Sequence, residues 1–397
     1  MVVKIEKGNF VLEENKSFYN QHVLGTIRDV IRPFFFPFLE TAPEEMHQQQ
    51  AVEKEFFRKF WDPKAPCRPE LIHHQKIRNN FTWRKEEVPI KVNGKSLTVT
   101  YSVIETKDCN QDDEVYNFIH VLGVTCTADN DIMSTYPLLA TYLEMKNRPP
   151  ARFILISQYE TRSENGTLYK VETLDQEVGK ILCNTLKVLE KKYGQIHQLL
   201  AYSLGCIVTA ASLKHFEAIK EVESEKSSLQ GRITLESQGM PKHITFDRGP
   251  SSVTELSKLY TGGSILLPLA KISGWDMDFG KEIAEFSRRF GEKAASISVI
   301  NVVKDHRFGN KVNLYESPYI KDLKDQGKVS AVLLDQPLQC AHQYAHHSTS
   351  LKIWNEHHIV EGTEDVLKGN KSLAYAILEK SMPRVVKKGL LFSWFGL

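Results

Sequence analysis

The sequence predicts an α/β fold with a mostly parallel sheet and helices on both of its faces. From about residue 116 onward, short apolar runs that end in turn residues alternate with segments of helical periodicity. Such alternation is typical of parallel strands joined by helices that cover the sheet. The chain has 397 residues, 41% of them hydrophobic, which is enough to bury a large core.

Residues 1–85 are expected to form a helical extension of this fold. Apolar residues recur at helical spacing in SFYNQHVLGTIRDVI, and Pro33 and Pro37 interrupt the pattern. A second helix is expected in QQQAVEKEFFRKFW, ending at Asp62-Pro63. Its aromatic side chains lie along one side, which favours packing against the main domain.

The main domain, residues 86–397, is expected to open with an antiparallel hairpin. Asn93-Gly94 joins two β-rich runs and suits a type I′ turn, in which both central residues have positive φ. Buried strands are then expected at 116–124, 151–160, 195–203, 243–249, 295–305 and 328–336. Helices are expected at 131–146, 173–194 and 204–220.

Ser203 lies at the predicted junction of a buried strand and a helix, in the sequence Ala201-Tyr202-Ser203-Leu204-Gly205. In a nucleophile elbow, G-x-S-x-G, the serine adopts a strained turn and the residues two before and two after it must be small. Ala201 and Gly205 meet that demand. The following helix would direct the backbone N–H of Leu204 at an oxyanion.

With the hairpin and the strand–helix series before it, this pentapeptide resembles the α/β-hydrolase fold over roughly residues 87–360. The A-x-S-x-G form is similar to the elbow of some bacterial lipases. The segments ITFDRGPSS and ISGWDMD also resemble uncharacterised α/β-hydrolase-like proteins of intracellular bacterial pathogens, some of them secreted effectors. The resemblance implies a catalytic triad in the chain order serine, acid, histidine.

Two aspartates are candidates for the acid of that triad. Asp305 follows the apolar run VINVV, where the family usually carries its acid, and would hold the tautomer of the histidine. Asp247, in ITFDRGP, is the alternative, because some lipase-like members take the acid from the preceding strand. Its neighbour Arg248 could instead engage it in an ion pair.

The base is expected among His342, His346 and His347, in the loop after the last predicted strand. His347 fits best, since small residues follow it, and His346 fits nearly as well. Adjacent histidines without a nearby carboxylate are not a typical metal site, so no metal is expected. The second oxyanion donor is expected to be the N–H of Val124, although the HG pattern of many esterases is missing.

Two further segments bear on substrate and partners. Residues 250–294 read either as a cap over the site or as ordinary packing of inserted helices. The apolar tail 389–397, GLLFSWFGL, could dock on its own domain, mediate self-association or touch a membrane interface.

These features predict a cofactor-free serine hydrolase that cleaves a carboxylic ester with an acyl or lipid part. The alternative is a hydrolase-like scaffold with little turnover that binds a host protein, another partner or a membrane surface. A net charge of +2 argues against nucleic-acid binding, and no phosphate-binding glycine motif follows a strand. The six scattered cysteines and the lack of a signal sequence favour a soluble protein, cytoplasmic or secreted without a cleaved signal peptide.

Overall fold

The computed structural model describes most of the chain between residues 43 and 334, together with two short strands near the N-terminus and one helix near the C-terminus. The described residues are 4–6, 9–11, 43–67, 71, 73–109, 114–123, 127–129, 132–169, 176–217, 238–258, 263–272, 274–275, 277–291, 294–302, 312–334 and 373–383.

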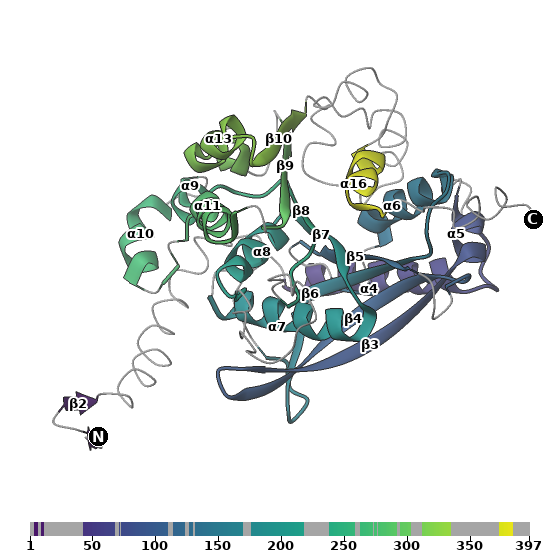
Figure 1. The fold of residues 1–397 in the computed structure, drawn as a ribbon. Helices are drawn as coiled ribbons and strands as arrows, with labels where there is room; N and C mark the ends of the chain where they lie inside the picture. The colour runs from purple at the N-terminus through teal and green to yellow at the C-terminus, as the bar shows by residue number, and fades with distance from the viewer. Residues whose placement is uncertain are drawn as a thin grey trace, which may run out of the picture.

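An eight-stranded sheet forms the centre of the molecule (Figure 1). Its order is β10-β9-β8-β7-β5-β6-β4-β3; β4 pairs antiparallel with both β3 and β6, and all other pairs are parallel. The strands are β3 (Phe81–Val92), β4 (Lys95–Thr106), β5 (Tyr116–Val121), β6 (Ala151–Ser163), β7 (Ile196–Tyr202), β8 (His243–Asp247), β9 (Ser296–Val302) and β10 (Val329–Leu334). A separate antiparallel pair, β1 (Lys4–Glu6) and β2 (Asn9–Val11), was not expected from the sequence.

The predicted hairpin and the predicted parallel strands are confirmed. Asn93 and Gly94 have φ of 50° and 78°, as a type I′ turn requires, and Val92 pairs with Lys95 across it. Every residue of β5 and β7 is buried, which explains why these strands read as continuous apolar runs rather than as alternating ones.

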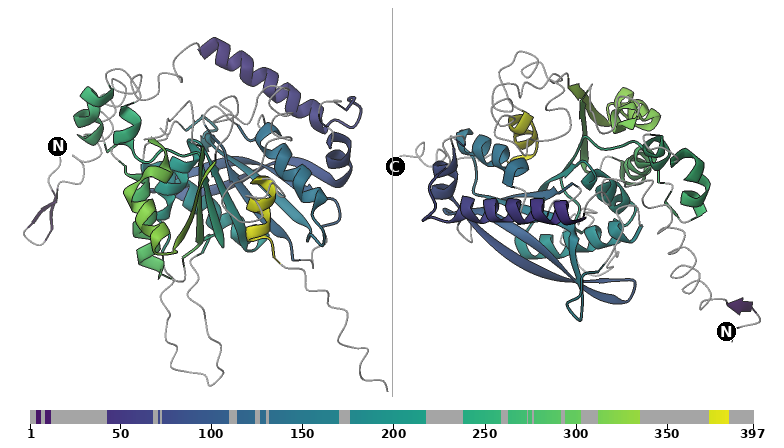
Figure 2. Two further views of the ribbon diagram at one scale, coloured as in Figure 1. Left: turned by 90° about the horizontal axis from the view of Figure 1, so that it is seen from above. Right: turned by 180° about the vertical axis from the view of Figure 1, so that it is seen from behind.

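Helices cover both faces of the sheet, as predicted (Figure 2). One face carries α7 (Gln176–Tyr193), α8 (Gly205–Leu213), α11 (Phe279–Phe290) and α13 (Pro318–Asp325). The other carries α4 (Pro43–Trp61), α5 (His74–Asn80), α6 (Ile132–Glu144) and α16 (Leu373–Ser381). The chain therefore has the mostly parallel α/β sheet with helices on both faces that its sequence predicted.

Of the two helices expected in the N-terminal region, the structure describes one. The second expected helix is α4, and α5 follows it, but β3 begins at Phe81 and so reaches into the stretch expected to be helical. The first expected helix, around residues 17–31, lies outside the described residues. No described helix combines the length and the apolarity needed to cross a bilayer.

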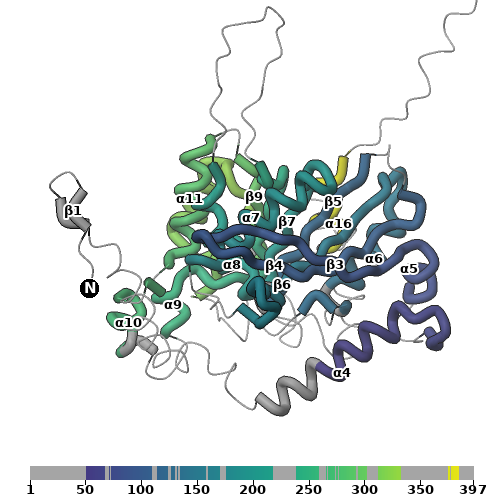
Figure 3. The backbone as a smooth tube through the Cα atoms, turned by 90° about the horizontal axis from the view of Figure 1, so that it is seen from below, coloured from purple at the N-terminus to yellow at the C-terminus, as the bar shows by residue number. Residues whose placement is uncertain are grey.

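Residues 250–294 form α9 (Val253–Ser257), α10 (Gly263–Ile272) and α11. The apolar side of α11 packs into the core, and Trp275, which precedes it, is fully buried. By contrast, α10 exposes Ile265 and Ile272 to solvent. Figure 3 places α4 and the pair α9 and α10 toward opposite ends of one side of the molecule.

Candidate active site

Ser203 occupies a sharp turn between β7, which ends at Tyr202, and α8, which begins at Gly205. Its φ is 53°, a left-handed conformation that serine seldom adopts. The turn is fixed from the neighbouring strand, because the N–H of Ser203 donates to the carbonyl of Asp247 at 2.9 Å. A strained serine at the end of a central parallel strand is the backbone arrangement of a nucleophile elbow.

The small residues around Ser203 are required by close backbone contacts. A Cβ on Gly205 would lie 2.4 Å from the carbonyl oxygen of Val121 and 2.8 Å from that of Leu122. A Cβ on Gly123 would lie 3.3 Å from the Cβ of Ser203. The structure thus gives the steric reason for Gly205, and it brings the end of β5 against the serine.

The backbone N–H of Leu204 is available to an oxyanion at this turn. Leu204 is the N-cap of α8, with φ of −65°, and no acceptor within the described part of the chain takes its N–H. The N-terminal end of a helix favours negative charge at this place. Val124, expected as the second donor, lies outside the described residues, but Gly123 directly before it lies beside Ser203.

Strand β8 ends in a second strained turn, directly beside the first. Asp247 pairs with Tyr202, and Arg248, which follows it, has φ of 57°. The N–H of Arg248 donates to the carbonyl of Ile300 at 2.8 Å, just as Ser203 donates to Asp247. Both side chains are fully buried, and Nε of Arg248 lies 3.4 Å from Oδ1 of Asp247. The ion pair considered from the sequence therefore forms.

A thiol also lies close to the elbow, and its surroundings make it a poor nucleophile. Burial, reinforced by the negative charge of Asp247, raises the pKa of the Cys206 thiol well above its ordinary value. Cys206 donates to the carbonyl of Ala201 at 3.2 Å. The thiolate needed for attack by Cys206 is therefore disfavoured.

The remaining candidates, Asp305, His342, His346 and His347, lie outside the described residues. The strands that lead to them are in place: β9 ends at Val302 and β10 at Leu334, and both run parallel to β7. All three strands therefore end at the same edge of the sheet, the edge at which Ser203 lies. The described part of the chain holds no cluster of three or more His, Cys, Asp or Glu side chains suited to a metal ion.

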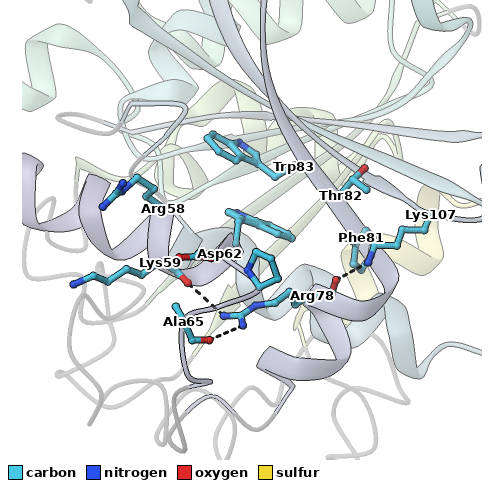
Figure 4. Close-up of a pocket in the computed structure, with 11 residues that line it drawn as sticks. Arg58, Lys59, Asp62, Ala65, Arg78, Phe81, Thr82, Trp83 and Lys107 are labelled. Atoms are coloured by element: carbon cyan, nitrogen blue, oxygen red, sulfur yellow. Dashed lines mark hydrogen bonds between the residues drawn. The ribbon is translucent and has the colours of Figure 1, made fainter.

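A hollow of about 560 Å³ lies at the opposite edge of the sheet, between α4, α5 and the start of β3 (Figure 4). The basic side chains in its lining are already engaged. Arg58 donates to Glu55, Lys107 donates to the carbonyl of Arg78, and Arg78 itself donates to carbonyls of α4 and the loop after it. These basic side chains therefore already have structural partners, and we look for the reactive site at Ser203 instead.

Two polar groups near the site were not expected from the sequence to take part in it. Arg248 was weighed only as a partner of Asp247, although a positive φ on an arginine marks a second constrained turn. Glu160, near the end of β6, accepts the N–H of Ala128 from the loop after β5 at 2.6 Å. A carboxylate in a run of buried strand residues indicates that Glu160 has a polar partner. The sequence does not identify that partner, because Ala128 lies in a distant segment.

Comparison with known proteins finds likeness in structure alone. The sequence matches no protein-family model and no curated protein sequence. Among solved structures, an acylaminoacyl peptidase from Pyrococcus horikoshii is similar with a TM-score of 0.47 and 12% identity, over 80% of this chain. The chain spans 44% of the length of that peptidase.

Two esterase structures are similar at about the same level. A feruloyl esterase module from Clostridium thermocellum has a TM-score of 0.42 and 12% identity, over 74% of this chain and 88% of its own. An S-formylglutathione hydrolase from Agrobacterium tumefaciens has a TM-score of 0.41 and 10% identity, over 70% of this chain and 94% of its own. We therefore infer function from the geometry of the site.

Proposed function

We propose that the chain is a serine hydrolase that cleaves a carboxylic ester through an acyl-enzyme. The observation that carries this proposal is the φ of 53° at Ser203, held between a central strand and the N-terminus of α8. Strain of this kind costs on the order of 1–3 kcal/mol and persists where a precise side-chain position is needed. A serine hydroxyl beside the N-terminus of a helix is suited to attack on an acyl carbon.

In the proposed mechanism, Oγ of Ser203 attacks the acyl carbon while His347 takes its proton. The oxyanion that forms is bound by the N–H groups of Leu204 and Val124, each contributing roughly 3 kcal/mol to the transition state. The tetrahedral intermediate then expels the alcohol, which receives the proton from His347. Water, activated by the same imidazole, attacks the acyl-enzyme and releases the carboxylic acid and free Ser203.

We assign the acid of the triad to Asp305, with Asp247 as the alternative. The ion pair with Arg248 supports this choice, because it already engages the carboxylate of Asp247 in a fully buried place. Asp305 follows the end of β9 by three residues, a reach of roughly 10 Å, so it starts from the right edge of the sheet. For the base, His347 is preferred, and His346 and His342 are the alternatives.

We propose that the ester carries an acyl chain or another lipid part. The exposed Ile265 and Ile272 on α10 support this, because α9 and α10 follow β8 at the edge of the sheet where Ser203 lies. Solvent-exposed isoleucines two helical turns apart lie on one side of a helix and suit an apolar ligand. In this proposal α10 acts as a small cap, and α11 belongs to the core layer.

Covalent labelling with a fluorophosphonate tests the proposed function. The wild-type protein is expected to be labelled once per chain, and Ser203→Ala is expected to lose labelling completely while unfolding at a similar urea concentration. Ser257→Ala, a buried serine of α9, serves as a control and keeps the label. If the folded wild-type protein is not labelled, the catalytically weak scaffold that binds a partner becomes the better interpretation.

A further inference from the structure

The loop after β5 is held from outside by side chains of other elements. Leu122 and Gly123 leave β5 beside Ser203, and Thr127 to Asp129 return toward α6. Ala128 is fully buried, and its N–H donates to Oε2 of Glu160 on β6 at 2.6 Å. Strand β6 can reach this loop because it continues past Ile156, which pairs with the last residue of β5.

A lysine joins the two acidic groups at this point. Nζ of Lys85, on β3, donates to Oδ2 of Asp129 at 3.0 Å and to Oε1 of Glu160 at 3.0 Å. The hydroxyl of Thr127 donates to the other oxygen of Asp129 at 2.9 Å, and Lys54 of α4 lies 3.6 Å from that oxygen. Four segments, α4, β3, β6 and the loop, therefore meet through this cluster.

The charges in the cluster stabilise one another. Burial alone would raise the pKa of Asp129, but hydrogen bonding and the charge of Lys85 hold it below its usual value. Burial likewise opposes the charge on Lys85, but Glu160 and Asp129 raise its pKa. Asp129 and Lys85 are thus both ionised at neutral pH. Their contacts form a network, which is stronger than an isolated surface pair.

We propose that Lys85, Glu160 and Asp129 form a clamp that positions the loop carrying the second oxyanion donor. The inference rests on the proposed function, in which Val124 in this loop donates to the oxyanion. In this proposal the three clamp residues do not touch the substrate or the reacting atoms. They act through the loop and are therefore positioning residues. An oxyanion donor acts only when it lies about 3 Å from the developing charge, so a loosened loop lowers the rate of chemistry rather than substrate binding.

Steady-state kinetics with p-nitrophenyl butyrate test the clamp. Lys85→Met removes the charge and keeps the length of the side chain, and we expect kcat to fall by roughly 10- to 100-fold with KM changed by less than about threefold. Lys85→Arg keeps both ion pairs and should restore kcat to within about threefold of the wild type. Lys95→Met is the matched control, since Lys95 lies in the same hairpin but donates to Tyr169, and it should leave both constants unchanged.

Hydrogen exchange of the backbone amides at 122–129 gives a readout that needs no activity. Lys85→Met is expected to speed exchange at Ala128, and Lys95→Met is not. If the fluorophosphonate does not label the wild-type protein but Lys85→Met still speeds exchange at Ala128, the clamp is retained and only the esterase activity is rejected. The clamp is rejected if exchange at Ala128 is unchanged in Lys85→Met, or if Lys95→Met lowers kcat as much as Lys85→Met does.

Discussion

At the scale of single residues, the positive φ values separate ordinary turns from constrained ones. Asn93 and Asn147 also have positive φ, but asparagine adopts the left-handed region readily. Serine and arginine adopt this region far less readily. Ser203 and Arg248 lie side by side at the ends of β7 and β8. Each is fixed by a hydrogen bond from its N–H to the next strand, so the sheet itself maintains the strain.

The strain at Ser203 predicts an unusual order of stability among its variants. Ser203→Gly and Ser203→Ala both remove the hydroxyl, but glycine relieves the left-handed conformation and alanine does not. We expect Ser203→Gly to be more stable than Ser203→Ala by about 1 kcal/mol in urea unfolding, although both are inactive.

Thr185 provides the control for that order, because it lies in the middle of α7. There glycine is expected to be less stable than alanine by about 1 kcal/mol, as in any helix interior. The same order at both positions would show that the backbone of Ser203 is not strained.

At the scale of elements, α4 is attached to α5 through Arg78. Its guanidinium donates from Nε to the carbonyl of Phe60 at 3.0 Å, from Nη1 to that of Ala65 at 2.8 Å and from Nη2 to that of Lys59 at 3.3 Å. Arg78 therefore caps the carbonyls at the C-terminal end of α4 with a positive charge. The same helix supplies Lys54, about two turns before its C-terminal end, to the clamp.

Replacing this arginine tests how α4 is held. A lysine keeps the charge of Arg78 but cannot reach three diverging carbonyls, so Arg78→Lys is expected to lower the free energy of unfolding by about 2 kcal/mol. Proteolysis within α4 should become faster in parallel. Arg58→Lys, an exposed position on α4 itself, should change neither quantity. An Arg78→Lys protein as stable as the wild type would mean that the aromatic packing of α4 suffices.

The elements that the sequence predicted well are those whose signals are local. The Asn93-Gly94 turn and the strand before Ser203 depend on neighbouring residues, so a short window reveals them. The clamp and the Arg78 cap depend on residues that meet only after the sheet has formed. From the sequence, Lys85 lies at the end of the expected helical extension and Glu160 at the end of an expected strand, and no spacing rule relates them.

At the scale of the whole molecule, the helices on the two faces of the sheet bury histidines that are neutral in the folded state. His197 and His243 lie near the starts of β7 and β8 and are almost fully buried. Burial, with a smaller contribution from the charge of Lys242, lowers the pKa of His197 to about 4. Burial, with a smaller contribution from Lys380, lowers that of His243 to about 3.

These histidines predict a loss of stability in mild acid. The unfolded chain takes up protons below pH 6.5, whereas folded His197 does so only near pH 4, so the free energy of unfolding falls as the pH is lowered through this window. The loss from His197 is about 3 kcal/mol between pH 7 and pH 4, since each unit of displacement corresponds to about 1.4 kcal/mol. Urea unfolding at several pH values in this range measures it.

His197→Asn isolates the contribution of one ring to that loss. Nδ1 of His197 accepts the N–H of Asn117 at 3.2 Å, and an asparagine oxygen can take over this role without titrating. The variant is expected to lose about 3 kcal/mol less than the wild type between pH 7 and pH 4. Glu86, whose pKa is lowered to about 2 by hydrogen bonds that outweigh its burial, loses its contribution only below about pH 4.5. The difference between variant and wild type above pH 4.5 therefore reports His197. Equal pH slopes for the two proteins there would mean that His197 is not neutral in the fold.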